Sequence, residues 1–174
     1  KNARYDECIF VHEGKGSITS SFGKMPLRKH DYIIIPKGVI WKVDVDQDVE
    51  FLTIESKSPI ETPSKYRNRL GQLLEHSPYS ERDIITPKLE NINARGSVDI
   101  KIRIDNGLQT YKYKKHPFDL VGWDGFYFPW IFNLNDFMPI TGMIHQPPPV
   151  HQVFQASGLV ICNFVPRLFD YHPL

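Results

Sequence analysis

Short apolar segments recur at even spacing over the first third of the chain. Asp31–Ile35 is a compact run of apolar, largely β-branched residues that ends at Pro36, Lys37 and Gly38. Such a run predicts a buried strand followed by a tight turn. Further strands are predicted over residues 5–12, 17–22 and 49–55, with Gly23 closing the second of them. Strands of this length and spacing are typical of an all-β sandwich or barrel.

Two further segments alternate apolar and polar residues with the period of two that marks a half-buried strand. The first places Val39, Trp41, Val43 and Val45 on one face and Lys42, Asp44 and Asp46 on the other. Residues 98–104 alternate in the same way, and Asn106 with Gly107 supplies the two positive-φ positions of a type I′ turn. Residues 97–115 therefore predict a β-hairpin, whose exposed lysines would protect an open edge.

The segment between residues 59 and 90 carries four prolines among polar and charged residues. It predicts a long irregular connection, with one helical turn near residues 70–74. Loops of this length often serve function or an interface, but a plain surface crossing is the favoured interpretation here. A last buried strand is predicted over residues 159–165 from its apolar composition.

The stretch from residue 121 to residue 151 is dense in aromatic rings and prolines. Aromatic rings in this number need a core or a pocket, and prolines fix torsions and remove amide donors. The stretch is therefore predicted to be neither a regular helix nor a central strand. It is interpreted as a rigid aromatic platform that delivers His145 and His151 to fixed places.

The composition is that of an ordinary globular protein, and 174 residues suffice for one domain, or for one domain and part of another. A formal net charge of +1 gives no indication of a nucleic-acid partner or an anionic membrane. No apolar run is long enough to span a bilayer. Cys8 and Cys162 form no disulfide framework, which favours a reducing, cytoplasmic location. The chain opens without Met and ends at Leu174, so a fragment of a longer polypeptide is expected.

The motif Pro36-x-Gly38-x-x-Trp41 invites comparison with cupin barrels, which often carry Pro-x-Gly-x-x-His with that histidine on a metal. Here Trp41 stands at the ligand position, and the sequence contains no His-x-His pair. Because an indole cannot bind a metal as an imidazole does, this half is predicted to be metal-free. A turn between two core strands, with Trp41 in the core, is the favoured interpretation.

His145 and His151 are the next candidates for chemistry. The proline-rich segment between them is extended, and six steps of about 3.1 Å separate the two Cα atoms by roughly 18 Å. One metal ion therefore does not bind both unless the chain bends. For each histidine a hydrogen-bonded structural role is favoured on composition, and a general base is the alternative because imidazole titrates near neutrality. The acidic residues fall on strand faces that are predicted to be solvated, and the sequence has no phosphate-binding loop or nucleophile elbow.

Several motifs resemble the homogentisate 1,2-dioxygenase family of iron enzymes. They are Phe-Gly-Lys-Met at residues 22–25, Ile-Pro-Lys-Gly at 35–38, Pro-Phe-Asp-Leu-Val-Gly-Trp-Asp-Gly at 117–125, Tyr127, Pro129, and Phe-Asn-Leu-Asn-Asp-Phe-Met-Pro-Ile at 132–140. The resemblance implies an all-β, cupin-like jelly roll or β-sandwich. It also implies a metal-free N-terminal β-domain over residues 1–120 and the first, incomplete part of a catalytic jelly roll over residues 121–174.

The function implied by this resemblance is the Fe(II)-dependent, ring-cleaving oxidation of homogentisate by O2 to maleylacetoacetate, in tyrosine and phenylalanine catabolism. His145 matches the family's acid/base histidine by position, and no role carries over to His151. The family's iron ligands, two histidines and a glutamate, are expected beyond Leu174. This segment alone is then expected to hold no iron, and the full-length protein is expected to be a homo-oligomer. The alternative is a non-catalytic β-domain for assembly or small-molecule binding.

Overall fold

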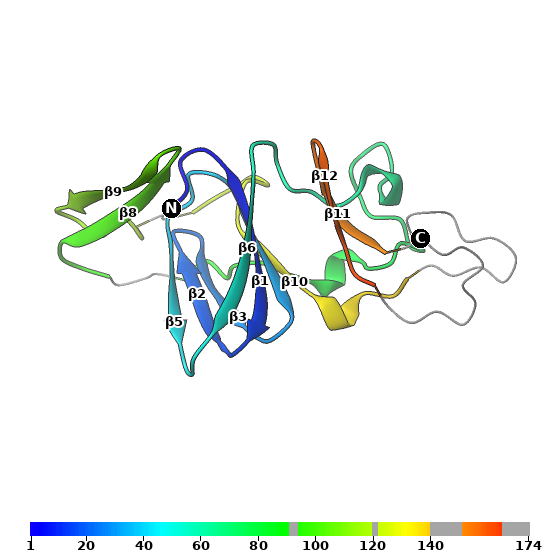
Figure 1. The fold of residues 1–174 in the computed structure, drawn as a ribbon, viewed down its shortest axis with the longest axis horizontal. Coiled ribbons are helices and arrows are strands. Elements are labelled where there is room, and N and C mark those ends of the chain that lie inside the picture. The colour runs from blue at the N-terminus through cyan, green and yellow to red at the C-terminus, as the bar shows by residue number, and fades with distance from the viewer. Residues whose placement is uncertain (91–93, 120–121, 140–150, 165–174) are drawn as a thin grey trace, which may run out of the picture.

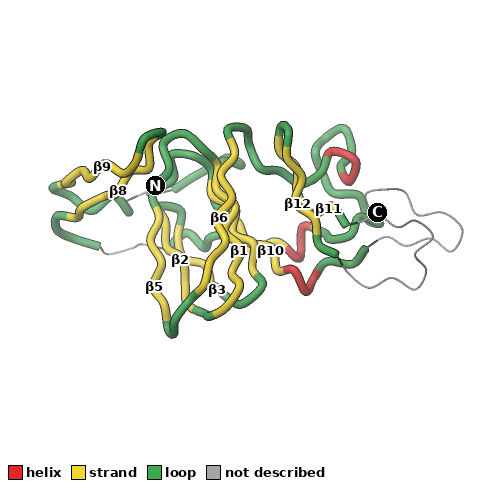
Figure 2. The backbone as a smooth tube through the Cα atoms, in the orientation of Figure 1, coloured by secondary structure: helices red, strands yellow, loops and turns green. Residues whose placement is uncertain are grey.

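The computed structural model describes residues 1–90, 94–119, 122–139 and 151–164, and it confirms the all-β prediction (Figure 1). Figure 2 shows strands and loops making up nearly all of this part of the chain. The strands are β1 (Asp6–Glu13), β2 (Gly16–Ser20), β3 (Gly23–Leu27), β4 (Asp31–Ile35), β5 (Trp41–Val45), β6 (Glu50–Ser56), β7 (Ile84–Ile85), β8 (Val98–Ile104), β9 (Gly107–Tyr113), β10 (Trp130–Asn133), β11 (Gln152–Ala156) and β12 (Leu159–Cys162). The 3-10 helices are η1 (Ser64–Tyr66), η2 (Glu81–Asp83) and η3 (Leu134–Asp136).

A five-stranded antiparallel sheet in the order β6-β1-β4-β10-β7 forms the centre of the molecule. β4 lies in its middle, where Ile33 pairs with Ile9 of β1 on one side and with Ile131 of β10 on the other. Every residue of β4 is buried, because both faces of this sheet are covered. That double burial explains why the residues of β4 after Asp31 form an uninterrupted run of Tyr and Ile instead of an alternation.

Alternate side chains of the central strands enter two different hydrophobic cores. The first, here called the sandwich core, lies between the central sheet and a three-stranded sheet in the order β3-β2-β5. Two antiparallel sheets packed in this way confirm the predicted cupin-like sandwich. The buried members of the sandwich core are Ile9, Val11, Ile18, Met25, Leu27, Ile33, Ile35, Val39 and Ile131.

The second core, here called the aromatic core, covers the opposite face of the central sheet. Tyr32 and Phe132 point into it from β4 and β10, and the β11–β12 hairpin closes it with Phe154. Its aromatic rings meet mostly edge to face, the arrangement that their charge distribution favours. Its buried members are Cys8, Tyr32, Ile34, Ile60, Tyr66, Tyr79, Phe132, Phe137, Val153, Phe154 and Ile161.

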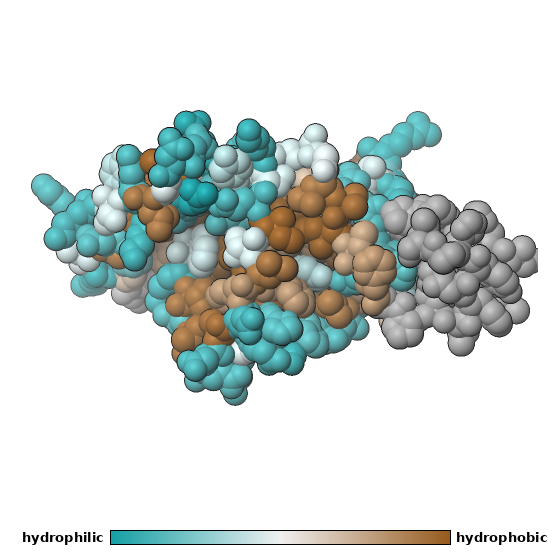
Figure 3. Space-filling view, viewed as in Figure 1, coloured by the Kyte–Doolittle hydropathy of each residue, from teal (hydrophilic) through white to brown (hydrophobic). Residues whose placement is uncertain are grey.

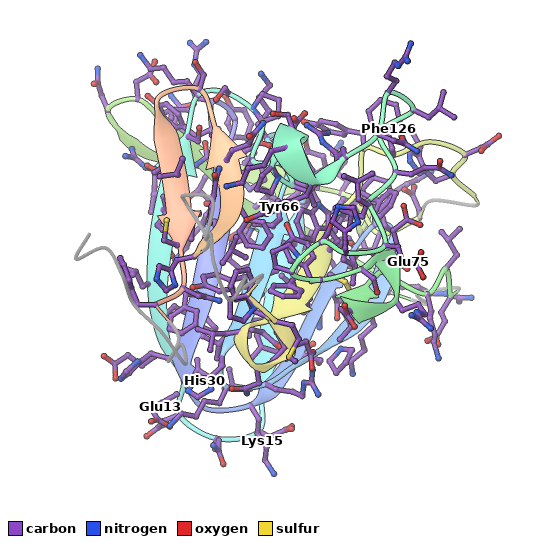
Figure 4. All side chains as sticks on the ribbon, turned by 90° about the vertical axis from the view of Figure 1, so that its right-hand side faces the viewer. Glu13, Lys15, His30, Tyr66, Glu75 and Phe126 are labelled. Atoms are coloured by element: carbon purple, nitrogen blue, oxygen red, sulfur yellow. The ribbon has the colours of Figure 1, made fainter. Side chains whose placement is uncertain are left out.

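The connection between residues 59 and 90 belongs to the aromatic core, which corrects the prediction of a plain surface crossing. Ile60, Tyr66 and Tyr79 are buried there, and the hydroxyl groups of Tyr66 and Tyr79 donate to the carbonyl oxygens of Gln152 and Val153 at 3.0 and 2.6 Å. Figure 4 shows Tyr66 in the interior while Glu75, from the same connection, lies at the surface. The helical turn predicted near residues 70–74 is wrong, because the only helices of the described connection are η1 and η2.

The aromatic stretch contains a central strand, contrary to prediction. β10 lies between β4 and β7 in the main sheet, because the prolines of this stretch flank it at Pro129 and Pro139 and leave its own amides free to pair. β10 lies after the predicted domain boundary at residue 120 and yet pairs with β4. Residues 120 and 121 are outside the described ranges, and the division into two domains stays a prediction.

The strand predicted over residues 17–22 is β2, and residues 21 and 22 form the turn that follows it. β2 ends at Ser20, and Gly23 begins β3 instead of closing β2. β3 contains Pro26, which has no amide to donate and is tolerated because β3 is an edge strand. Trp41 and Val43 of β5 are partly buried on the predicted inward face. Val45 was predicted on the same face but is exposed at the end of the strand.

The β8–β9 hairpin is confirmed, but its turn is displaced by one residue. Ile104 pairs with Gly107, so Asp105 and Asn106 form the two-residue loop. Among the described residues other than glycine, only His30 has a positive φ, so the type I′ assignment of Asn106 is wrong. The strand predicted over residues 159–165 ends at Cys162 as β12, and exposed Val160 contradicts full burial.

Gly23→Ala is expected to lower the free energy of unfolding by about 2–4 kcal/mol. At Gly23, φ is +125°, and a Cβ added there would lie 1.9 Å from the backbone oxygen of Lys88. Gly107→Ala is the matched control, since φ is +139° there and an added Cβ meets nothing within 4 Å. In the control, the free energy of unfolding should fall only by the cost of placing alanine at a positive φ, about 1–2 kcal/mol. Urea unfolding measures both variants, and equal losses would contradict the contact with Lys88.

Candidate functional site

The predicted acid/base residue, His145, lies outside the described residues, but the chain on either side of it is well fixed. Phe137 and Phe154 are both buried in the aromatic core. Tyr79 contacts both rings, with centroids 6.3 Å away in each case. The two described flanks of residues 140–150 therefore enter one packed core.

His151 lies immediately before β11, and the described residues around it leave one of its ring nitrogens without a hydrogen bond. Its carbonyl oxygen accepts a hydrogen bond from the amide of Asn163 at 2.7 Å, and its ring packs against Phe164 with centroids 4.9 Å apart. Its Nδ1 atom is buried and has no hydrogen-bond partner within the part of the chain that the structure describes. The favoured interpretation of His151 was a hydrogen-bonded structural histidine, and no described residue supplies such a bond at Nδ1, although buried polar atoms normally have a partner.

Asn163 is the second residue of this site with a buried polar atom that no described residue hydrogen-bonds. The residue is only 4% exposed, and its Oδ1 accepts a hydrogen bond from the Tyr32 hydroxyl at 2.6 Å. Its Nδ2 is buried, and no residue in the described ranges accepts a hydrogen bond from it. Burial raises the pKa of Tyr32 to about 12, so the phenol keeps its proton and acts as a donor. The site thus offers an amide N–H group to a hydrogen-bond acceptor.

A cavity of about 410 Å³ adjoins these groups. It lies under an apolar surface, and Figure 3 shows apolar residues gathered across the middle of this face of the molecule. Phe164, at the rim of the cavity, is 79% exposed. Small-molecule sites are commonly apolar cavities with few polar groups. The lining residues are Phe10, Tyr32, Leu52, Ile54, Leu134, Ile161, Cys162, Asn163 and Phe164.

The two cysteines are not poised as nucleophiles. Burial raises the pKa of the Cys8 thiol to about 12 and also raises the pKa of Cys162, so both stay protonated near neutral pH and the thiolate form that attacks is scarce. Both are free thiols.

The described residues do not fit an iron site of the kind that the resemblance implies. A 2-His-1-carboxylate site needs three such ligands together, and within residues 1–90, 94–119, 122–139 and 151–164 no group of three His, Cys, Asp or Glu side chains could hold a metal ion. No chemical step can therefore be assigned to a metal held by these residues.

The predicted cupin-type turn is present, with Trp41 half-buried at its end. Gly38 takes a φ of +86° in the turn between β4 and β5, and Trp41 Nε1 donates a hydrogen bond to Glu7 Oε2 at 3.1 Å. Where a cupin histidine would bind a metal, the indole N–H instead binds a carboxylate. The indole thereby occupies a carboxylate that could otherwise be offered to a metal ion.

The prediction that the acidic residues are solvated is wrong for three of them. Asp6, Glu7 and Asp31 are buried. Asp31 accepts hydrogen bonds from the Arg28 amide and from Asn133 Nδ2, both at 2.7 Å, which satisfies its carboxylate without solvent. A short acidic side chain directly before a fully apolar run is the signal that could have identified it, because such residues close turns through their own backbone.

Tyr32→Phe is expected to lower the free energy of unfolding by about 1–3 kcal/mol, because it leaves the buried amide of Asn163 without its side-chain partner. Chemical denaturation of both proteins measures the difference. Tyr111→Phe is the matched control, since its exposed hydroxyl donates only to Gln109, and it should change stability by less than about 0.5 kcal/mol. A Tyr32→Phe variant as stable as the control would contradict this role.

A two-sheet antiparallel sandwich with a Pro-x-Gly turn between β4 and β5 defines a cupin-like β-domain. A family model described as "Homogentisate 1,2-dioxygenase N-terminal" matches residues 1–134. The chain therefore belongs to the homogentisate 1,2-dioxygenase family, which confirms the resemblance carried by its motifs.

Individual relatives agree with this assignment. A protein of Saccharolobus solfataricus named "Putative dioxygenase" is 42% identical over 173 residues, which cover 99% of this chain and 45% of that protein. Homogentisate 1,2-dioxygenases of Mus musculus and Homo sapiens are 28% and 26% identical over 173 residues, each covering 94% of this chain and 38% of the enzyme. The chain thus spans less than half the length of these relatives. In the part of the chain that the structure describes, no helix has the length and apolar character needed to cross a membrane.

Proposed function

We propose that the full-length protein containing this chain is an Fe(II)-dependent dioxygenase that opens the aromatic ring of homogentisate with O2 to give maleylacetoacetate, in tyrosine and phenylalanine catabolism. The observation that carries this proposal is the family match over residues 1–134. It is supported by relatives named homogentisate 1,2-dioxygenase that align with 94% of the chain.

In this proposal Fe(II) is bound by residues outside the described ranges and would supply O2 activation. The proposed role of this chain is to help bind and orient the substrate and to move a proton. His145 accepts the proton of a substrate hydroxyl, which makes the ring more electron-rich, and an imidazole suits this because it titrates near neutral pH. The aromatic core supports the role by fixing Phe137 before this segment and Phe154 after it, since catalytic groups must be held in place by packed neighbours.

O2 uptake by the full natural gene product tests the proposal. The protein is loaded with Fe(II) under anaerobic conditions, and uptake is followed on adding homogentisate. Uptake that needs both iron and homogentisate is the expected result. O2 uptake that occurs without iron and without homogentisate would reject homogentisate as the substrate. The absence of O2 uptake in a protein that retains iron would reject it as well.

A second candidate function is a non-catalytic domain for assembly or small-molecule binding. It is favoured by the lack of a three-ligand metal group among the described residues. A coding frame that continues into a segment with two histidines and a glutamate would count against it, whereas failure of the full-length protein to retain iron would favour it.

We also propose that the full-length protein is a homo-oligomer. Apolar side chains exposed on the described surface, such as Leu52 and Val160, are available for contacts between subunits. Sedimentation of the full-length protein as a monomer would end this part of the proposal.

A further inference from the structure

A second cavity, of about 490 Å³, lies on the other side of the central sheet from the aromatic core, between the β8–β9 hairpin and the strands β1, β5 and β6. It is remote in the chain from the segment that contains His145. Its apolar wall comes from Trp41, Val98, Ile100, Leu108 and Phe118. Its volume is in the range of natural small-molecule sites.

Two carboxylates face each other at this cavity. Glu7 of β1 and Glu55 of β6 are directly paired across the antiparallel strands, and both line the cavity. Like charges in directly opposed positions destabilise a sheet. The Asn2 amide nitrogen lies between them, 2.7 Å from Glu55 Oε1 and 3.5 Å from Glu7 Oε1. This neutral amide relieves the repulsion only in part.

Four cationic side chains, those of Lys1, Lys42, Lys101 and Arg103, line the cavity together with the carboxylates of Glu7, Glu55 and Asp99. Arg103 Nε lies 3.4 Å from Glu55 Oε1, and Lys42 is paired with Asp44 at 2.9 Å. Lys101 and Asp99, two residues apart on exposed positions of β8, have opposite charges. In the described part of the chain, Glu7 has no ion-pair partner within 4.0 Å.

Glu7 is therefore a buried carboxylate with spare binding capacity. The residue is 8% exposed, and burial raises its pKa, opposed by the hydrogen bonds from Trp41 and Asn2 and by the field of the Lys1 α-amino group. A carboxylate has about four acceptor positions, and among the described residues only Trp41 and Asn2 donate to those of Glu7. Buried carboxylates normally have a cationic partner.

We propose that this cavity binds a small organic amine, whose ammonium group pairs with Glu7 while its apolar body packs against Trp41, Ile100 and Phe118. The ammonium group has three hydrogen-bond donors, and two of them can use the acceptor positions on Glu7 that Trp41 and Asn2 leave free. A cation near the indole of Trp41 is further stabilised by the aromatic ring. The inference does not depend on the proposed dioxygenase function.

A metal ion is a poorer occupant than an amine. Glu7 and Glu55 provide only two ligand residues, and the described residues include no group of three that could hold a metal. The indole at position 41 adds a hydrogen-bond donor instead of a ligand. The apolar wall would also leave a hydrated metal ion without partners for its water.

Calorimetric titration of the full natural gene product with three probes of one shape tests the proposal. The probes are benzylamine, benzyl alcohol and benzoate, which differ in charge at one position. Benzylamine alone is expected to bind measurably, and Glu7→Gln is expected to weaken it about 10- to 100-fold, because a charge-assisted hydrogen bond is lost. Glu50→Gln, an exposed glutamate on the strand that carries Glu55, is the control and should leave binding unchanged.

A second pair of variants leaves the buried network intact. Leu108 lines the cavity and is 65% exposed, so Leu108→Lys and Leu108→Glu should both fold. They are expected to weaken and strengthen benzylamine binding by about 2- to 5-fold, respectively. Binding of benzoate in preference to benzylamine, no binding of any probe, or benzylamine binding that is unaffected by Glu7→Gln would overturn the proposal. Homogentisate-dependent O2 uptake should be the same with and without Glu7→Gln, so failure of one proposal leaves the other intact.

Discussion

Replacing His145 by alanine in the full natural gene product is expected to lower homogentisate-dependent O2 uptake by about 10²- to 10⁴-fold, the usual contribution of a general acid or base. The proposed reason is that the substrate hydroxyl then keeps its proton and the ring stays electron-poor. Iron content should remain close to normal, because the proposed ligands lie elsewhere. Oxygen-electrode rates and metal analysis of the same samples separate the two effects.

His76→Ala is the matched control for this experiment. His76 is exposed in the connection between β6 and β7, and its loss should leave both the rate and the iron content unchanged. A normal rate in His145→Ala would reject the acid/base role. A loss of iron together with activity would instead make His145 a residue that supports metal binding.

Phe154→Ala is expected to lower the free energy of unfolding by about 3–5 kcal/mol, as for other large aromatic side chains removed from a core. Phe154 is fully buried, and its ring contacts those of Tyr32, Trp130 and Phe132 at centroid distances of 5.5, 5.3 and 6.0 Å. The remaining rings cannot collapse into the space, because Tyr32 is held on β4 and both Trp130 and Phe132 are held on β10. Urea or thermal unfolding measures the loss.

Phe126→Ala serves as the control, since Phe126 is 93% exposed and lies at the surface in Figure 4. It should change stability by less than about 0.5 kcal/mol. A loss below about 1 kcal/mol in Phe154→Ala would contradict the aromatic core as described. Because natural domains are stable by only about 5–15 kcal/mol, the expected loss is a large share of the total.

Local sequence pattern predicts the strands whose environment is uniform along their length. Asp31–Ile35 was predictable as a strand because both of its faces are buried, and the β8–β9 hairpin because its strands alternate regularly. β3 and β10 were missed because proline lies within or beside them. In each case position in the sheet makes proline harmless: Pro26 lies in an edge strand, and Pro129 precedes β10.

The parts of the fold and site that sequence could not predict depend on contacts between distant segments. The buried tyrosines of residues 59–90 follow no helical or strand period, so nothing local marks Tyr66 and Tyr79 as core residues. The unpartnered atoms of His151 and Asn163 arise only when β12 meets the start of β11. The sequence pattern marked His145 as a candidate, but its assignment as the acid/base residue came from the family resemblance. The charge of Glu7 became notable only once β6 placed Glu55 opposite it.

The place of β10 in the central sheet has a consequence for how the chain folds during synthesis. β4 pairs with β1 soon after both have left the ribosome, but its other edge pairs with residues 130–133, about a hundred positions later in the sequence. Pairings between such distant segments form slowly. Until then the nascent chain presents Ile33 and Ile34 on an unpaired apolar edge, which is a template for aggregation. Synthesis of the intervening segment therefore sets how long this edge of β4 stays unpaired.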